Sequence, residues 1–419
     1  MLSILARIDF AQIVTGILIS IPAAALGALI KGFLSRHVMA DMRADRAAAR
    51  KEREAAVEAR DAAHASRDRA LDERETALKT LVRREAEAEQ QRKQLDELQR
   101  KLGTEREKLD RLLHTLRESD TSLWTTFPRR PPFIDFDSRI GRRKPLIMTV
   151  ANNKGGVGKT TVVGNLIAYF DTKRKKRVLA IDMDYQGSLS TLLRAERDEI
   201  GERHSNVNAL LARDAQPMAL LSAMRSLGGE LGRSRLVPSF YELALLEDRL
   251  MVEWLLQENE GNDVRYRLAN VLLHPHVQQA FDIILIDVPP RLSAGTINAL
   301  CTSTHLLVPS IFNPLAAEPV SNFLTASKSL LDELNPKLEF LGVIETMAPP
   351  RNQGQGPRAR GRSAIEEALI RFPGLTIMDA FIPRRQPMSE GGVAYLADAE
   401  VRGFFDNLGD EISRKMGLQ

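Results

Sequence analysis

One stretch of ten residues carries the strongest chemical signal in the chain: Asn152-Asn153-Lys154-Gly155-Gly156-Val157-Gly158-Lys159-Thr160-Thr161. A triphosphate is held by several backbone N–H groups that point inward, and residues without a Cβ let the chain curl that tightly. The side chain of Lys159 is expected to reach the β- and γ-phosphates, and the hydroxyl of Thr160 to ligate Mg²⁺. The stretch therefore predicts a phosphate-binding loop whose nucleotide-binding residues are Gly155, Gly156, Val157, Gly158, Lys159, Thr160 and Thr161.

The loop departs from the general G-x-x-x-x-G-K-[ST] pattern in one place. Asn153 stands at the first glycine position, and a second lysine, Lys154, follows it. An ordinary glycine-rich turn is the alternative interpretation. The apolar run before the loop and the helix-like run after it give the order of strand, turn and helix that a phosphate-binding loop requires, and this order favours nucleotide binding.

Two later strand-like runs end in carboxylates. Residues 178–184 end in Asp182 and Asp184, which point the same way because side chains alternate along a strand. The second run ends in Asp287. Ligands of open α/β sheets bind at the carboxyl ends of the strands. One carboxylate of the first pair is expected to bind Mg²⁺ through water and the other to position the attacking water, while Asp287 is the expected acidic partner of Thr160 and the metal.

The elements that must hold these residues alternate between strand-like and helix-like runs. Near-continuous apolar strands separated by helices predict a parallel sheet covered by helices on both faces, in a domain of residues 146–419. The predicted fold class is therefore α/β, of the P-loop NTPase type. The expected strands are Leu146–Ala151, Val178–Asp182, Phe281–Asp287, His305–Pro309 and Glu339–Ile344.

These motifs resemble those of the ParA/MinD family of P-loop ATPases. The string from Lys154 to Thr161 is similar to the family's deviant Walker A motif. Asp182-Met183-Asp184-Tyr185-Gln186-Gly187 resembles its Asp-x-Asp-Pro-Gln-Gly, with Tyr185 in place of the proline. Asp287-Val288-Pro289-Pro290 resembles its Asp-x-Pro-Pro Walker B motif. Val237-Pro238-Ser239 and Phe381-Ile382-Pro383-Arg384 also fall where ParA-like proteins carry similar strings.

The resemblance implies a homodimer formed around two ATP molecules, with ATP and Mg²⁺ as ligands. Lys154 would reach the partner's phosphates and neutralise charge that builds up during phosphoryl transfer. Lys159 and Asp184 complete the implied catalytic set, because Asp184 would organise the hydrolytic water. The other implied site residues are Thr160, Asp182 and Asp287 at the metal, and Pro383 and Arg384 near the adenine.

The start of the chain carries a candidate membrane span. Residues 10–30 form a run of 21 uncharged residues, and about 20 apolar residues are enough to cross a bilayer as a helix. Residues 1–9 would be a short external tail and residues 10–34 the transmembrane helix. Lys31, Arg36, Arg43 and Arg46 follow the run, so the positive-inside rule predicts a single-pass protein of the inner (cytoplasmic) membrane with its ATPase domain in the cytoplasm. A cleaved signal peptide and an interfacial helix broken at Pro22 are the alternatives.

Residues 35–119 are predicted to form a helical coiled-coil stalk. The stretch is dense in charged residues and alanine and has no proline. A seven-residue repeat predicts pairing of helices, and so a homodimer or higher homo-oligomer, with an unpartnered solvated helix as the alternative. Residues 120–145, with four prolines, are predicted to be a partly ordered Pro/Arg-rich linker. The seven-residue repeat of the stalk consists of Leu81, Ala88, Leu95, Leu102, Leu109 and Leu116.

Composition narrows the classes of function. The single cysteine, Cys301, excludes a disulfide framework and a cysteine-based metal site. A net charge of +4 is too small to imply nucleic acid by itself. The basic cluster at residues 173–177 is either a solvated helix end or a contact with DNA backbone or anionic lipid, and residues 349–362 are predicted to form an Arg-rich loop that gains order on a partner.

The predicted function is a membrane-anchored ParA-like ATPase that hydrolyses ATP slowly and acts as a nucleotide switch in positioning, partition or assembly of a partner complex. A partner protein that stimulates or reads the ATPase is expected, and non-specific DNA is a possible further partner. Two alternatives remain. Bacterial tyrosine kinases place a related domain behind transmembrane segments but usually carry a tyrosine-rich tail, whereas the last tyrosine here is Tyr395. An ATP-binding membrane scaffold without turnover is disfavoured by the intact Lys154, Lys159, Asp184 and Asp287.

Overall fold

The computed structural model describes two compact units, Met1–Ser119 and Asp120–Gln419. The residues that it describes are 46, 49–54, 87–104, 106–107, 110, 120–193, 206–256, 262–313, 315, 317–349, 355–388 and 392–418.

Helical segments lie side by side in the first unit. Residues 49–54 and 87–104 are helical, and the side-chain amide of Gln91 donates a hydrogen bond to the Glu52 carboxylate. One straight helix would place these two residues about 58 Å apart at 1.5 Å per residue. Leu95 and Leu102 of the seven-residue repeat are 58% and 66% exposed, so the coiled coil stays a prediction.

The expected location in the inner membrane is corrected by the structure. Among the residues described, no helix combines the length and the apolar character that a membrane crossing requires. The longest helix of the second unit, α15 (Ala317–Leu334, 18 residues), carries charges such as Glu318, Lys328 and Asp332 and buries one apolar side in the domain. The segment predicted to span the membrane, residues 10–34, lies outside the described residues.

The second unit is built on an eight-stranded sheet in the order β3-β4-β2-β5-β1-β6-β7-β8. All neighbouring strands are parallel except β3 and β4, which pair antiparallel. The five expected strands are present, and β3, β4 and β8 extend the sheet beyond them. The strands are β1 (Leu146–Val150), β2 (Val178–Asp182), β3 (Arg225–Ser226), β4 (Arg235–Val237), β5 (Ile283–Asp287), β6 (His305–Ser310), β7 (Glu339–Ala348) and β8 (Ile377–Pro383).

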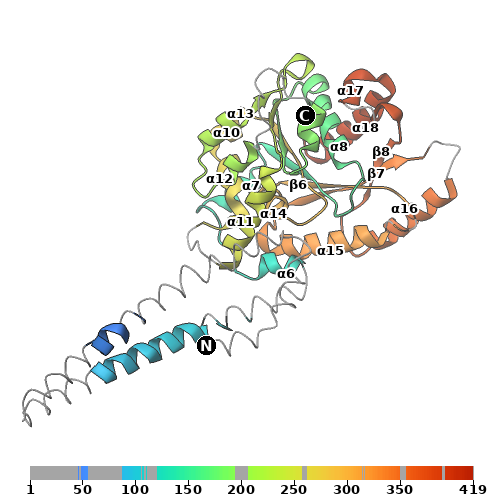
Figure 1. The fold of residues 1–419 in the computed structure, drawn as a ribbon. Helices are drawn as coiled ribbons and strands as arrows, with labels where there is room; N and C mark the ends of the chain where they lie inside the picture. Colours follow the sequence, from blue (N-terminus) through green and yellow to red (C-terminus); the bar gives the residue numbers. More distant parts are fainter. Residues whose placement is uncertain are drawn as a thin grey trace, which may run out of the picture. The chain divides into compact units, whose positions relative to one another are not determined.

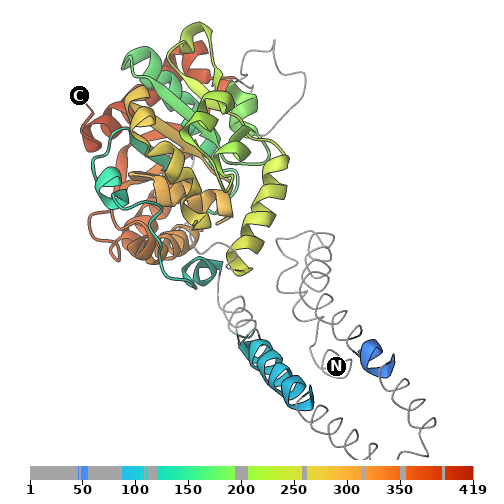
Figure 2. The same cartoon turned by 90° about the vertical axis from the view of Figure 1, so that its left-hand side faces the viewer.

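Helices cover both faces of this sheet (Figure 1; Figure 2). On one face, α8, α9 and α18 form a core cluster with alternate residues of the strands, such as Met148, Ala180 and Leu285. On the other face, α14 approaches β1, where Thr149 and Ser303 share a hydrogen bond of 2.6 Å between hydroxyls. The helices are α6 (Asp120–Thr125), α7 (Phe136–Gly141), α8 (Lys159–Ala168), α9 (Ser188–Leu193), α10 (Pro217–Ala223), α11 (Glu242–Leu256), α12 (Arg267–Leu272), α13 (Pro275–Ala280), α14 (Ala294–Thr302), α15, α16 (Gln355–Leu369), α17 (Ala394–Ala397) and α18 (Ala399–Lys415), with a π-helical turn, η2 (Tyr169–Lys173), after α8 and a 3₁₀ turn, η6 (Val264–Tyr266), before α12.

Residues 120–145, predicted as a linker, belong to the same compact unit as the sheet. The helices α6 and α7 bracket the proline-containing run, and the side chains of Trp124, Phe136 and Ile140 are buried. Because large aromatic side chains contribute strongly to burial, these anchors hold the segment on the domain.

Candidate nucleotide-binding site

The phosphate-binding loop follows β1, where the direction of strand order reverses. Strand β1 lies between β5 and β6, which come later in the chain on opposite sides of it. A crevice at such a switch point is where open α/β sheets bind ligands. Asn152 fixes the start of the loop, because its side-chain amide donates to the Pro309 carbonyl at 2.8 Å and its Oδ1 accepts from the Lys154 N–H at 3.0 Å.

The glycines of the loop adopt backbone conformations that other residues rarely adopt. Gly156 and Gly158 have φ of 69° and 80°, and Gly158 is the residue that caps the start of α8. Val157, between them, is buried, and its carbonyl accepts a hydrogen bond from the Thr346 hydroxyl at 2.8 Å. The loop is thus held from β7 on one side and opens α8 on the other, so the unpaired N–H groups of the first turn of α8 belong to the site.

The two lysines of the loop have different surroundings. Lys159 is 7% exposed, and its ammonium donates to the Lys154 carbonyl at 3.3 Å. Lys154 is half-buried, and its side chain forms no ion pair with any residue in the described part of the chain. Lys159 is therefore held within its own loop, where the phosphates are expected to bind, whereas the charge of Lys154 is available to a ligand or a second chain.

Asp287 and Thr160 are brought together as the sequence predicts. The Thr160 hydroxyl donates to Oδ2 of Asp287 at 2.6 Å. The other carboxylate oxygen, Oδ1, is buried and has no hydrogen-bond partner among the described residues. An orphaned buried carboxylate oxygen is costly, and carboxylate and hydroxyl oxygens are ligands that Mg²⁺ prefers. Thr160 and Asp287 therefore fit a bound Mg²⁺.

Asp182 lies beside Asp287, since the two residues are register partners in β2 and β5. Both of its oxygens are engaged: Oδ1 accepts from the Asp184 N–H at 3.0 Å, and Oδ2 accepts from the N–H and hydroxyl of Ser190 at 2.8 and 2.7 Å. These bonds tie the end of β2 to α9. Asp182 thus positions the Asp184 loop, and its predicted place at the metal stays a prediction.

Burial and like charges make the site electrostatically strained without a ligand. Burial raises the pKa of Asp182 to about 7. Burial first, and the nearby Asp182 charge second, raise the pKa of Asp287 well above its usual value. Burial also lowers the pKa of Lys159, although Asp287 and Asp184 oppose that change. A divalent cation at this edge would offset the surplus of buried carboxylates.

The two predicted adenine-site residues lie at the same edge of the sheet. Pro383 ends β8 and is the register partner of Ala348, and the Arg384 N–H donates to the Ala348 carbonyl at 2.9 Å. Pro383 is buried and Arg384 is exposed. The end of β7 links them to the phosphate loop, because Thr346 contacts Val157. Their place near the adenine stays a prediction.

A network that the sequence did not predict joins the loop after β2 to the loop after β5. The Arg291 guanidinium lies 5.4 Å from the centre of the Tyr185 ring and pairs with the buried Glu247 at 2.7 Å. Glu247 also accepts from the Ser293 hydroxyl and from the Gly295 N–H at 2.9 Å, at the start of α14. Glu247 lies on α11, more than forty residues from its partners in sequence, so no local spacing revealed it.

Several cations of the two basic clusters form ion pairs within the domain. Lys173 pairs with Asp406 and Asp410, and Arg177 with Asp282. In α16, which begins inside the stretch predicted to be a loop, Arg358 forms a bidentate pair with the buried Glu345 at 2.6 and 2.7 Å. These ion pairs favour structural roles for both clusters, so DNA binding gains no support from them.

The arrangement defines a P-loop NTPase fold, and the comparisons agree. A family model described as an AAA domain matches residues 146–340. The chain is similar to the crystal structure of cobyrinic acid a,c-diamide synthase from Mycobacterium smegmatis with bound ATP analog and magnesium, with a TM-score of 0.51 and 26% identity over 64% of this chain and 94% of that one.

Two relatives then identify the family. The chain is 30% identical over 246 residues to the chromosome partitioning protein ParA of Caulobacter vibrioides, covering 58% of this chain and 82% of that protein. It is 30% identical over 264 residues to the sporulation initiation inhibitor protein Soj of Bacillus subtilis, covering 61% of this chain and 93% of that protein. The chain belongs to the ParA/Soj family of P-loop ATPases.

Proposed function

We propose that this protein binds ATP with Mg²⁺ and hydrolyses it slowly as a sandwich dimer, so that the nucleotide switches the contact between two ATPase domains. The observation that carries the proposal is the Thr160–Asp287 pair beside the buried Lys159, with one Asp287 oxygen left without a partner among the described residues. A catalytic site needs this combination of cation, hydroxyl and carboxylate to hold a triphosphate and its metal.

Each residue has a distinct task in this proposal. The backbone N–H groups of the loop and Lys159 bind the β- and γ-phosphates. Thr160 and Asp287 hold Mg²⁺, which when bound neutralises charge on the phosphate oxygens. Asp184 accepts a hydrogen bond from the Gln186 N–H at 3.0 Å through Oδ1, which fixes the carboxylate that orients the attacking water. Pro383 and Arg384 border the adenine.

Lys154 acts on the neighbouring protomer. Its side chain is half-buried and is free of ion pairs within the described residues. A lysine that crosses to the partner's phosphates stabilises charge in the transition state, as an arginine finger does. ATP binding therefore brings two domains together, and hydrolysis releases them.

The biological output is proposed to be positioning or partition of a partner complex, since the relatives include a chromosome partitioning protein. A partner protein that stimulates or reads the ATPase belongs to this proposal. The bacterial tyrosine kinase alternative is disfavoured, because Tyr395, the last tyrosine of the chain, is buried in the domain. Its phenol donates a hydrogen bond to Asp406 at 2.7 Å. A buried tyrosine does not serve as a phosphorylation site in the way that an exposed tyrosine-rich tail does.

The proposal is tested by ATP turnover and nucleotide binding of the full chain and two variants. Lys159→Ala is expected to lose ATP binding. Lys154→Ala is expected to bind ATP but to lose turnover by about a thousandfold, the effect of a charge supplied in trans in related phosphoryl transfer. A Lys154→Ala protein that hydrolyses ATP as fast as the parent would refute the role of Lys154, and a parent that neither binds nor hydrolyses ATP would refute the function.

A further inference from the structure

The segment that begins the second unit contacts the loop that follows Asp287. We call residues 120–130, comprising α6 and the extended run after it, the N-terminal strap. Its Trp124 is 1% exposed and lies against Trp254 of α11, with ring centroids 6.0 Å apart and planes inclined by 23°. Phe127 packs edge-on against the same ring at 4.8 Å. The strap is therefore anchored on the domain by aromatic side chains.

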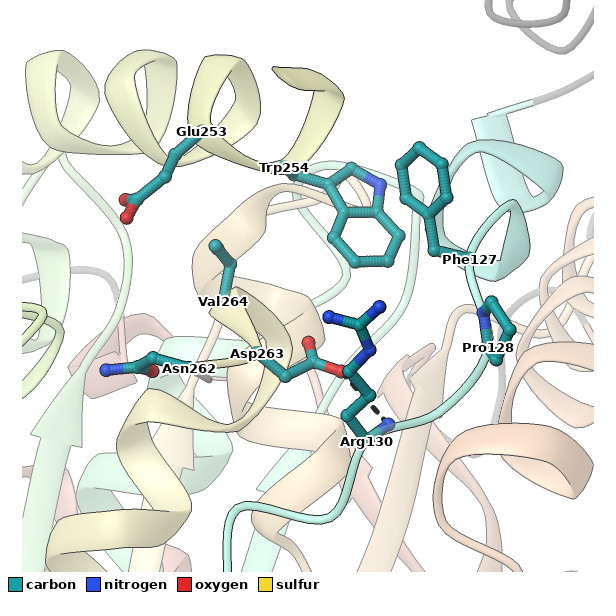
Figure 3. Close-up of a pocket in the computed structure, with 8 residues that line it drawn as sticks. All are labelled: Phe127, Pro128, Arg130, Glu253, Trp254, Asn262, Asp263 and Val264. Atoms are coloured by element: carbon teal, nitrogen blue, oxygen red, sulfur yellow. Dashed lines mark hydrogen bonds between the residues drawn. The ribbon is translucent and has the colours of Figure 1, made fainter. Parts of the chain in front are cut away.

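A buried arginine holds the strap by its backbone. The guanidinium of Arg265, in η6, donates to the carbonyls of Trp124, Phe127 and Pro128 at 2.7, 3.1 and 2.9 Å. Asp263 balances its charge at 2.7 Å and also accepts from the Arg130 N–H at 3.3 Å, the bond drawn in Figure 3. The seam between strap and α11 leaves a cavity of only about 30 Å³ (Figure 3), too small for a ligand of more than a few atoms.

The strap contacts the loop that follows Asp287, the residue at the end of β5 that is proposed to hold the metal. The indole N–H of Trp124 donates to the carbonyl of Leu292 at 3.2 Å. Leu292 is five residues beyond Asp287, in the loop between β5 and α14. Its neighbour Arg291 faces the Tyr185 ring, next to Asp184. A short chain of contacts thus runs from Trp124 through residues 288–293 to Tyr185, which is next to Asp184.

We propose that Trp124 is a positioning residue for ATP turnover, and that docking of the N-terminal strap is coupled to the nucleotide state of the site. The coupling is reciprocal by thermodynamic necessity. A change in the docking of the strap alters nucleotide binding at the site, and nucleotide binding alters the surroundings of Trp124. Since α6 begins where the first unit ends, the strap is the covalent connection between that unit and the ATPase domain. The inference rests on the proposed ATPase function.

The chain offers a matched pair of variants, because Trp124 and Trp254 are its two tryptophans. Trp124→Phe removes the bond to Leu292 and keeps a ring in the cluster. Trp254→Phe removes a comparable bond, from its indole to the Leu123 carbonyl at 2.9 Å, but leaves Trp124 on the loop. In the full chain, Trp124→Phe is expected to lower kcat by about three- to tenfold, the worth of one hydrogen bond, with KM for ATP changed less. Trp254→Phe loosens the strap but leaves the bond of Trp124 to Leu292 intact, so it is expected to lower kcat by a smaller factor than Trp124→Phe does.

Fluorescence supplies a second readout that does not depend on turnover. In Trp254→Phe the remaining emission comes from Trp124, and ATP with Mg²⁺ is expected to shift it. The added variant Lys159→Ala should abolish that shift. Unchanged kcat in Trp124→Phe, together with no ATP-dependent shift in Trp254→Phe, would overturn the inference. If Trp124→Phe does not fold, the fluorescence of Trp254→Phe alone decides. Failure of the parent to bind ATP would instead count against the proposed function.

Discussion

At the scale of single residues, the site separates groups that bind a ligand from groups that hold the binders in place. In the described part of the chain, Asp287 keeps one oxygen without a protein partner, whereas both oxygens of Asp182 are bonded to Asp184 and Ser190. The two carboxylates are register partners at the same sheet edge, and the sequence predicts the same metal role for both. Only the partners of each oxygen distinguish them, and one of those partners, Ser190, lies eight residues away from Asp182.

Ser190 should stabilise the fold through Asp182. Ser190→Ala removes a hydroxyl that donates to Asp182 at 2.7 Å and accepts from the Ser239 N–H at 3.0 Å. Because it leaves a buried N–H without its partner, the change is expected to lower the free energy of unfolding by about 1–3 kcal/mol in urea titrations without nucleotide. Ser188→Ala, on the same helix, is the control and should cost less than about 0.5 kcal/mol. Equal effects of the two variants would argue against the bonding role of Ser190.

Gly158 should be intolerant of a side chain for reasons of backbone conformation. Its φ of 80° is unfavourable for an L-residue, although a Cβ there would meet no atom closer than 3.9 Å. Gly158→Ala is therefore expected to destabilise the nucleotide-free protein by about 1–2 kcal/mol. Gly155→Ala, where neither φ nor space opposes a Cβ, should cost less than about 0.5 kcal/mol. Thermal or urea unfolding of both variants checks the difference, and an unaffected Gly158→Ala would contradict it.

At the scale of elements, the central strands could be predicted because each is apolar throughout and ends in a recognisable motif. β1, β2, β5, β6 and β7 start within two residues of the expected positions and end within four. β3 has two residues and β4 three, which is too short for a pattern to appear. The first half of α16 falls in the stretch 349–362 that is predicted to be a loop, because glycine, proline and arginine follow its first residue, Gln355. Its pairing of Arg358 with Glu345 depends on β7, and no local pattern contains that information.

β6 begins with a histidine that should make stability depend on pH. His305 is buried, and its Nδ1 lies 2.8 Å from the Thr304 hydroxyl. Burial, aided by Arg143 and opposed by Glu339, lowers the pKa of His305 to about 4. The unfolded chain therefore binds a proton at higher pH than the folded one, and stability contributed by the neutral ring is lost as pH falls below about 6.5.

The comparison with His305→Gln isolates this effect from other titrating groups. Between pH 7.5 and 5, the parent is expected to lose about 2 kcal/mol more than the variant, at 1.36 kcal/mol per pKa unit. Urea titrations at several pH values measure the difference. Parallel pH profiles for the two proteins would show that His305 is protonated in the folded state within this range.

At the scale of the whole molecule, sequence reasoning placed the ATPase domain and its motifs but not the segment before it. Four prolines and many arginines favoured a linker over residues 120–145. The structure instead docks this segment on the domain through Arg265, which lies 137 to 141 residues away from the carbonyls that it holds. Contacts over such separations have no sequence signature. The family resemblance succeeded because its motifs are local strings.

The central claim, that Lys154 completes the ATP site of a partner protomer, has a direct test in mixed dimers. Lys154→Ala and Asp184→Ala are each expected to be inactive alone. Coexpressed with different tags and purified through both, they form dimers in which Asp184 of one chain meets Lys154 of the other at a single intact site. We expect about half of the parental turnover per dimer, because a two-fold dimer of this kind keeps one of its two sites complete. Turnover no higher than that of either variant alone would contradict it.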